Sequence, residues 1–233
     1  MKSVFIRCAL TLVLFFSQNG IAKGKEEINY FVSVYRKTAV GEPFNSLSIE
    51  KLVVMASPGM GEAQVQKINR ELEKLYAAIY SDARSCYVPE IKHPWGFSMK
   101  HEQIHLAYGI LGIVFDISAV CAGEPHFGKV VQNFSTRTGK AISSFQLVRR
   151  YMPSLIKAGA VPDESFLILG EEAAEILVDQ NEHLLTPELK KDCDYYFKTT
   201  AFDTMVKQEG LVLLPVYQRA FSKCQKEYLL RIE

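Results

Sequence analysis

Five consecutive residues, His101-Glu102-Gln103-Ile104-His105, match the zinc-peptidase motif His-Glu-x-x-His. In that motif a helix places both imidazoles on one face, one turn apart, so that they bind one Zn²⁺ ion. The glutamate between them then activates a zinc-bound water. The chemistry that these residues could carry is peptide hydrolysis, with His101 and His105 as metal ligands and Glu102 as the catalytic base.

The residues that follow this motif favour a strand over the required helix. Gly109, Gly112 and a run of Ile, Val and Phe are typical of β structure. In a strand, His101 and His105 would share a face about 13 Å apart at 3.3 Å per residue, which is too far for one ion. We therefore expect an extended backbone at 101–105.

A third metal ligand has no motif around it. The extended metzincin pattern needs a histidine six residues after His105, where Leu111 stands. The remaining candidates are Glu124, His126, Glu171 and Glu172. We therefore expect neither a bound metal cofactor nor peptidase activity, and the alternative is a zinc-dependent metallopeptidase that uses His101, Glu102 and His105.

Other residues could contact a ligand without performing chemistry. Glu124 and His126 lie in a tight corner that begins at Cys121, and Trp95, the single tryptophan, could present its ring to a glycan. The serines lack a Gly-x-Ser-x-Gly elbow, so nothing supports a serine hydrolase. Glu124, His126 and Trp95 are therefore the candidate binding residues, and the alternative is that the corner is structural and that Trp95 anchors a loop on the core.

The first 22 residues have the pattern of a signal peptide. Lys2 and Arg7 precede an apolar run at 8–16, and Gly20-Ile21-Ala22 offers a cleavage site before residue 23. The apolar run is too short to span a bilayer, which needs about 20 residues. We therefore expect a periplasmic or secreted protein that has no membrane anchor once the signal is removed.

The charge of the mature chain argues against nucleic acid as a partner. Removing Lys2 and Arg7 leaves 25 basic against 26 acidic residues. No basic surplus is available to neutralise phosphates.

Four cysteines remain after the signal peptide: Cys86, Cys121, Cys193 and Cys224. An even number in an oxidising compartment favours disulfides, and four cysteines allow three pairings. We favour Cys86–Cys121 and Cys193–Cys224, because each pair brackets a continuous strand-rich block.

The order of the elements predicts an α+β fold, with an antiparallel β-sheet packed against a few α-helices and stabilised by disulfides. Apolar residues recur with helical spacing from Val65 to Ile79, and Ser143 or Ser144 and Thr186-Pro187 could begin further helices. We expect one domain over 23–233, with a strand pair at 28–60, a helix at 61–84, and a sheet with helices at 102–233. Within these blocks, strands are expected at 28–36, 51–56, 103–120, 126–135, 202–206, 211–217 and 228–232, and one more helix at 170–181.

Several separated landmarks resemble the RsiV-like/PdaC-like family of bacterial extracytoplasmic domains. They are the dipeptide Ile68-Asn69, the corner Gly123-Glu124-Pro125-His126, the hairpin 133–140 and the strand that begins at Gly210-Leu211. The chain departs from the family pattern in the corner, where histidine and proline are transposed and Glu124 replaces a small residue. Ser135 also replaces the common aspartate of the hairpin.

The resemblance implies an α+β domain of the bacterial envelope without catalytic machinery of its own. In RsiV such a domain binds lysozyme. We therefore expect a non-enzymatic recognition module whose partner is a protein, conceivably lysozyme, or a cell-wall glycan.

Overall fold

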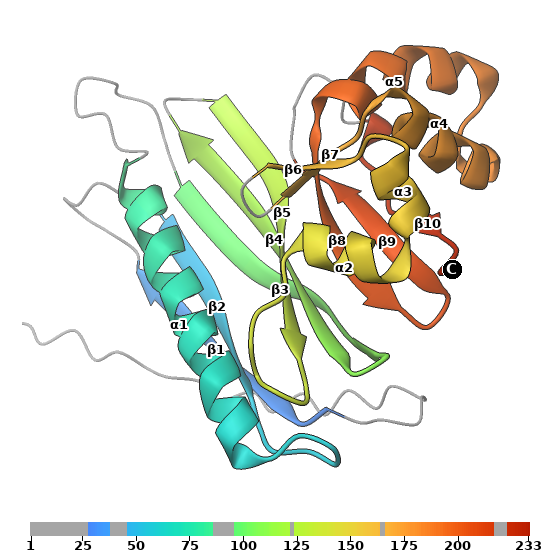
Figure 1. The fold of residues 1–233 in the computed structure, drawn as a ribbon. Coiled ribbons are helices and arrows are strands. Elements are labelled where there is room, and N and C mark those ends of the chain that lie inside the picture. The colour runs from blue at the N-terminus through green and yellow to red at the C-terminus, as the bar shows by residue number, and fades with distance from the viewer. Residues whose placement is uncertain (1–27, 38–45, 86–95, 122–123, 164–165, 217–222) are drawn as a thin grey trace, which may run out of the picture.

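The structure is a computed structural model that describes residues 28–37, 46–85, 96–121, 124–163, 166–216 and 223–233 (Figure 1). The expected signal peptide, Cys86 and Trp95 lie outside the described residues. None of the helices in these ranges is long and apolar enough to cross a bilayer.

The first sheet has five strands in the order β1-β2-β3-β4-β5. Neighbouring strands are antiparallel except for β2 and β3, which run parallel. The central strand β4 is buried on both faces over residues 110–115, where five of the six residues are Ile, Leu, Val or Phe. The strands are β1 (Tyr30–Lys37), β2 (Ser46–Val54), β3 (Gly96–Ala107), β4 (Ile110–Cys121) and β5 (Glu124–Ser135).

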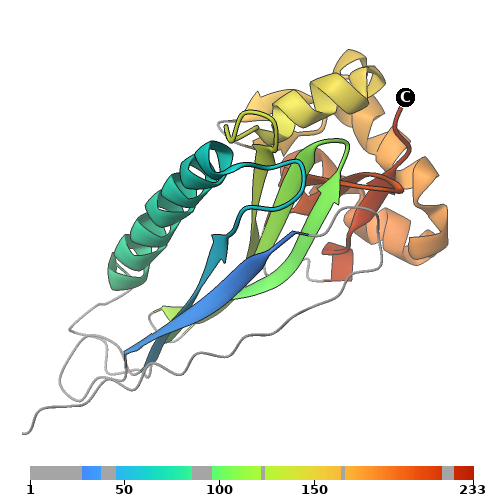
Figure 2. The same ribbon diagram turned by 90° about the horizontal axis from the view of Figure 1, so that it is seen from below.

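Helix α1 (Glu62–Ser85) covers one face of this sheet (Figures 1 and 2). Val65, Ile68, Leu72, Tyr76 and Ile79 are buried, which confirms the apolar face predicted from their spacing. They pack on apolar side chains of β2, β3 and β4 and form one core of the protein.

Two polar side chains of α1 also complete β2 where β3 does not pair with it. Asn69 Nδ2 donates to Val54 O and its Oδ1 accepts from Val54 N, both at 2.9 Å. The Tyr76 hydroxyl makes the same two contacts with Leu52, both at 2.8 Å. Backbone groups that would otherwise lose their partners are thereby satisfied from the helix.

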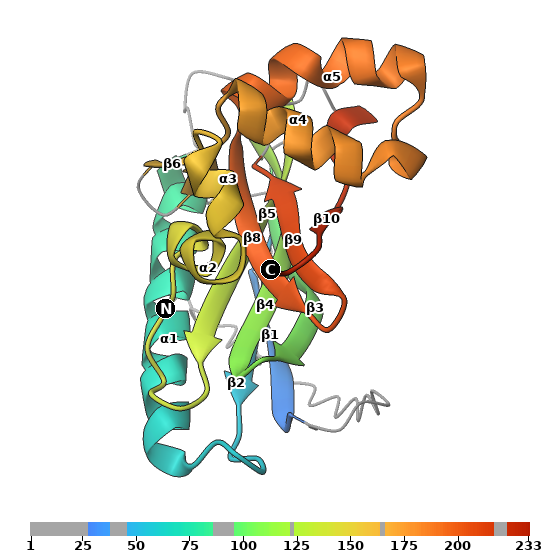
Figure 3. The same cartoon turned by 45° about the vertical axis from the view of Figure 1, so that its right-hand side comes forward.

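The second sheet is antiparallel and has the strand order β10-β9-β8-β7-β6. Four α-helices and a short 3-10 turn surround it on the side away from the first sheet (Figures 1 and 3). The strands are β6 (Val161–Asp163), β7 (Phe166–Ile168), β8 (Ala201–Lys207), β9 (Gly210–Pro215) and β10 (Tyr228–Leu230); the helices are α2 (Ser144–Tyr151), α3 (Pro153–Lys157), α4 (Glu171–Gln180), η1 (Glu182–Leu184) and α5 (Pro187–Thr199).

The helix boundaries follow from local chemistry. Ser143 caps α2 in a capping box with Gln146, and Pro153 begins α3 after the break at Met152. Thr186 caps α5 through Leu189 N, as its position before a proline predicts. The α+β class is confirmed, but the strands form two sheets where the sequence indicated one.

The two sheets contact each other through a small apolar interface. Val114 and Val131 of the first sheet meet Met205, Val212 and Leu214 of the second. Alternation along β9 directs Leu211 and Leu213 to the opposite side, under the helices. The first sheet is therefore covered by α1 on one face and by the second sheet on the other.

A buried polar cluster connects the sheets beside this interface. The carboxylate of Asp203 in β8 accepts from Val131 N of β5 at 3.1 Å and from Ser144 Oγ of α2 at 3.0 Å. Ser144 Oγ in turn accepts from Thr204 N, and Asn133 Nδ2 donates to Thr204 O. Burial raises the pKa of Asp203 to about 7, against the lowering effect of the two bonds it accepts.

Candidate functional site

The peptide 101–105 lies in strand β3, which confirms the extended backbone expected there. The pairing of β3 with β4 shifts by one residue at this point, because His101 pairs with Phe115 whereas Gln103 pairs with Val114. Glu102 is thus the extra residue of a β-bulge. The bulge reverses the alternation, so His101 and His105 lie on opposite faces of the sheet.

The surroundings of the two imidazoles agree with this assignment. The His101 ring contacts Tyr30 and Phe115 on the α1 face, with ring centroids 5.4 and 6.4 Å away. His105 Nε2 lies 3.0 Å from Gln103 Oε1 on the face of the second sheet. Burial lowers the pKa of both histidines, and for His105 the neighbouring Lys207 adds to the effect.

The expectation that both histidines share a face is therefore wrong, because a one-residue bulge was not visible in the sequence. The Glu102 carboxylate is ion-paired with Lys129. The helical arrangement that would bring His101, Glu102 and His105 to one zinc ion is not formed. Within the described residues, no group of three His, Cys, Asp or Glu side chains is arranged to hold a metal ion.

A groove with a volume of about 520 Å³ opens where the first sheet extends beyond the second. Its floor consists of two rows of side chains that cross β3, β4 and β5 in register. One row is Ser98, Ser118 and Phe127, and the other is Lys100, Asp116 and Lys129. Leu214 and Pro215 of β9 and the segment 225–227 form the wall.

The charged groups of the groove are held by an ion-pair network. Lys129 Nζ bridges Glu102 and Asp116, with the Asp116 oxygen 3.2 Å away. Burial opposes the charge of Lys129, but these two carboxylates raise its pKa. On the wall, Glu227 accepts from Lys207 at 2.7 Å and from Gln103 at 2.6 Å, and both bonds lower its pKa although burial opposes them.

Phe127 is the large apolar side chain that this groove exposes to solvent. It is 58% exposed, whereas Leu214 on the wall is buried. An aromatic ring beside paired charges and hydroxyls offers apolar contact and hydrogen bonds in one place. The arrangement suits binding of a polar ligand with an apolar part.

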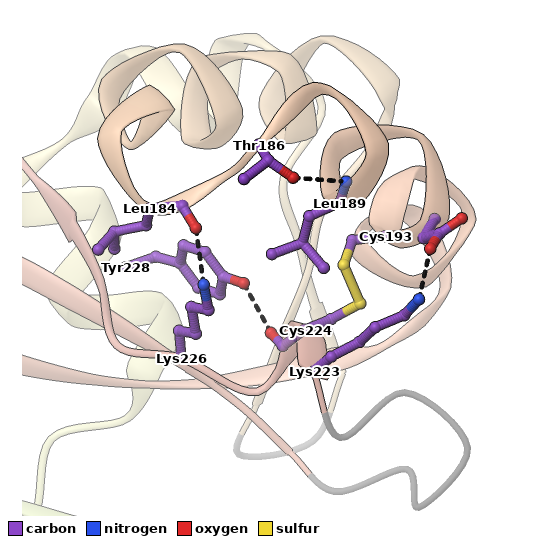
Figure 4. Close-up of a disulfide and its surroundings, with 9 residues drawn as sticks. Leu184, Thr186, Leu189, Cys193, Lys223, Cys224, Lys226 and Tyr228 are labelled. Atoms are coloured by element: carbon purple, nitrogen blue, oxygen red, sulfur yellow. Dashed lines mark hydrogen bonds and ion pairs between the residues drawn. A yellow bond between two sulfur atoms is a disulfide. The ribbon is translucent and has the colours of Figure 1, made fainter.

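The disulfide Cys193–Cys224 supports the groove wall (Figure 4). It joins α5 to the chain immediately before Gln225, and the Tyr228 hydroxyl donates to Cys224 O at 2.6 Å. Lys226 Nζ donates to Leu184 O, also at 2.6 Å, which fixes the same segment from the other side. The favoured pairing of Cys193 with Cys224 is confirmed.

The second favoured pairing falls partly outside the described residues. Cys121 at the end of β4 is disulfide-bonded. Its expected partner, Cys86, is not among the described residues.

Of the three expected binding residues, His126 is the one whose side chain the structure describes, and it does not line the groove. His126 is exposed in β5, but its side chain lies on the face opposite to that of Phe127, because successive residues of a strand alternate. The side chain of Glu124 and all of Trp95 lie outside the described part of the chain. Glu171, proposed as a further metal ligand, is paired with Lys198 on the surface of α4 and α5.

The residues that form the groove floor were not among the candidates predicted from the sequence. Their signal is a polar residue at every second position of a strand-like run, as at Asp116 and Ser118 near the end of β4. Such alternation marks the part of a strand where one of its two faces becomes exposed to solvent. The alternation alone does not show which strands lie side by side.

Comparison with solved structures finds two proteins of the DUF3298 family. A DUF3298 family protein from Pseudomonas aeruginosa PAO1 has a TM-score of 0.51 and 15% sequence identity, over 89% of this chain and 91% of that one. A DUF3298 family member from Bacteroides fragilis has a TM-score of 0.47 and 11% identity, with the same coverage. The similarity to the Pseudomonas protein shows a shared fold. No family model matches the chain, and no curated protein matches it.

Proposed function

We propose that this chain is an exported, non-enzymatic recognition protein of the bacterial envelope that binds its partner in the groove between the two sheets. The signal-peptide pattern of residues 1–22 supports export, and the disulfide Cys193–Cys224 suits an oxidising compartment. The resemblance to the RsiV-like family supports a recognition role for the described fold.

The chemistry of the groove supports binding over catalysis. A carboxylate that acts as a general base must be free to take a proton from the substrate. In the groove, Asp116, Glu227 and Glu102 are each ion-paired with a lysine and are therefore not free in this sense. These pairs fix the shape of the surface and leave hydroxyls and the Phe127 ring for contact with a partner.

The observation that carries this proposal is the exposed ring of Phe127 in the concave site. Aromatic side chains contribute disproportionately to the energy of recognition when they become buried in a complex. A partner that covers Phe127 would remove its apolar surface from water, which typically contributes about 2 kcal/mol for a side chain of this size.

Binding assays with purified lysozyme and with insoluble peptidoglycan test the proposal. The wild-type protein is expected to be retained by one of them, and Phe127→Ala should weaken retention at least 10-fold. Tyr195→Ala is the matched control, because Tyr195 is 68% exposed on α5 and does not line the groove. Equal retention of the wild type and Phe127→Ala would exclude the groove as the binding site.

A further inference from the structure

Strand β5 forms an edge of the first sheet, and its outward backbone groups are only partly used. It pairs with β4 on one side, and towards its end the groups of the other side find partners within the protein. Val131 N donates to Asp203, Asn133 O accepts from Ile142 N, and Ser135 N donates to Lys140 O. The backbone N–H and C=O groups of residues 131, 133 and 135 therefore point away from β4.

By the same alternation, the backbone N–H and C=O groups of Phe127 and Lys129, which precede these residues, also point away from β4. Their backbone N–H and C=O groups have no hydrogen-bond partner on that side among the described residues. Position 125, the next outward one, is a proline and has no N–H to offer. The available edge is thus short and spans residues 127 to 129.

This short edge borders the groove, since the side chains of Phe127 and Lys129 form part of the groove floor. Phe127 and Lys129 are about 7 Å apart along the strand. Alternate residues of an added strand have the same spacing, so their backbone groups could pair with those of both residues. A segment added here would place alternate side chains beside Phe127 on the groove face of the sheet. The edge and the groove therefore form one continuous surface.

The charges of this surface define the partner segment. Asp116 shares Lys129 with Glu102, and Glu227 is paired with Lys207. Lys100 and Lys226 also line the groove, and neither has a carboxylate partner among the described residues. Four lysines, at 100, 129, 207 and 226, thus stand against three carboxylates, at 102, 116 and 227, and the net positive charge complements acidic side chains.

We infer that β5 accepts an extended, acidic peptide segment of a partner protein as an additional strand at Phe127 and Lys129. This inference rests on the proposed function of the groove and specifies its partner as a polypeptide. The outward groups of the two residues supply up to four backbone hydrogen bonds, and Lys100 and Lys226 supply the charge preference. Each lost hydrogen bond is expected to weaken binding by roughly 2- to 10-fold.

Selection from a phage-displayed library of random dodecapeptides supplies the probe. Enriched peptides are expected to carry Asp or Glu at alternate positions. In the complex, amide hydrogen exchange at Phe127 and Lys129 should slow at least 10-fold. Gly128, whose N–H points towards β4, should show little change. Enrichment of no peptide, or binding without protection of these two amides, would overturn the inference.

A pair of variants tests the backbone separately from the side chain. Lys129→Pro removes the outward N–H, whereas Lys129→Ala removes only the ammonium and its ion pairs. The affinity for the selected peptide should be lower in Lys129→Pro than in Lys129→Ala by roughly 2- to 10-fold, which is the effect of one lost hydrogen bond. Equal affinities of the two variants would contradict strand addition.

The proposed function fails independently of this inference. Loss of binding in Phe127→Ala together with equal affinities of the two Lys129 variants would retain the groove and exclude the added strand. Protection confined to the groove floor by soluble muropeptides, with no selected peptide, would identify a glycan partner and overturn the peptide inference.

Discussion

The buried carboxyl group of Asp203 makes the stability of this protein depend on pH in an unusual direction. Burial raises its pKa from 3.8 to about 7 in the folded state. Between these values the folded protein keeps a proton that the unfolded chain has released. The contribution of Asp203 to the free energy of unfolding is therefore fully present below about pH 4 and is lost as the pH rises to about 7.

The size of this contribution follows from the shift. A difference of about 3 pKa units corresponds to roughly 4 kcal/mol at 1.36 kcal/mol per unit. Asp203→Asn removes the titration and keeps a side chain of the same shape. Its Oδ1 can still accept from Val131 N, and its amide can donate to Ser144 Oγ. The variant should gain stability relative to the wild type as the pH rises from 4 to 8.

Urea denaturation followed by circular dichroism, at intervals from pH 4 to pH 8, measures this difference. Histidines and other carboxyl groups titrate in both proteins, so their effects cancel in the comparison. Asp163→Asn, which removes an exposed carboxylate of β6, is the control and should follow the wild-type profile. Parallel profiles for Asp203→Asn and the wild type would refute the assignment of a raised pKa to Asp203.

Three further predictions concern the disulfide, the completion of β2 and the histidines. Replacing Cys193 and Cys224 together by alanine opens a loop of 31 residues. This should lower the free energy of unfolding by about 4 kcal/mol in urea denaturation, and an unchanged midpoint would contradict it. Asn69→Leu leaves two backbone groups of β2 without partners, so a thermal melt should show a loss of about 1–3 kcal/mol, and an unaltered melting temperature would count against this role. In metal analysis after zinc loading, His101→Ala and His105→Ala should each match the wild type, whereas one stoichiometric zinc lost in both would show a shared site.

The sequence predicted local structure well where one residue type has one physical role. Ser143 and Thr186 mark helix starts because their hydroxyls accept from exposed backbone N–H groups. Helical spacing from Val65 to Ile79 identified the buried face of α1, and the run of Ile, Val and Phe after Gly109 identified a strand. The short strands β6 and β7 were missed, since three residues are too few to show a period.

The bulge at Glu102 could not be read from the sequence, because one extra residue in a strand leaves its composition unchanged. Its consequence for His101 and His105 is large, since a shift of one residue exchanges the two faces of a sheet. The residues 101–105 thus match the sequence motif His-Glu-x-x-His, but the bulge places the two histidines on opposite faces of the sheet.

The groove could not be predicted from the sequence, for a different reason. Its floor and wall come from segments about 115 residues apart, at Ser98–Lys100 and Leu214–Pro215, and only the packing of two sheets brings them together. Composition identified each strand, but not its neighbour in the other sheet. Asn69 was noted as part of a family landmark, yet its role in completing β2 became visible only in the structure.

Mapping of amide chemical shifts during titration with lysozyme and with soluble muropeptides tests the central claim most directly. Recognition in the groove predicts that the bound ligand shifts the amide signals of Ser118, Phe127 and Gln225 together, since the first two lie on the floor and the third on the wall of one site. Perturbations confined to α1, or to the surface of α5 around Tyr195, would contradict the account.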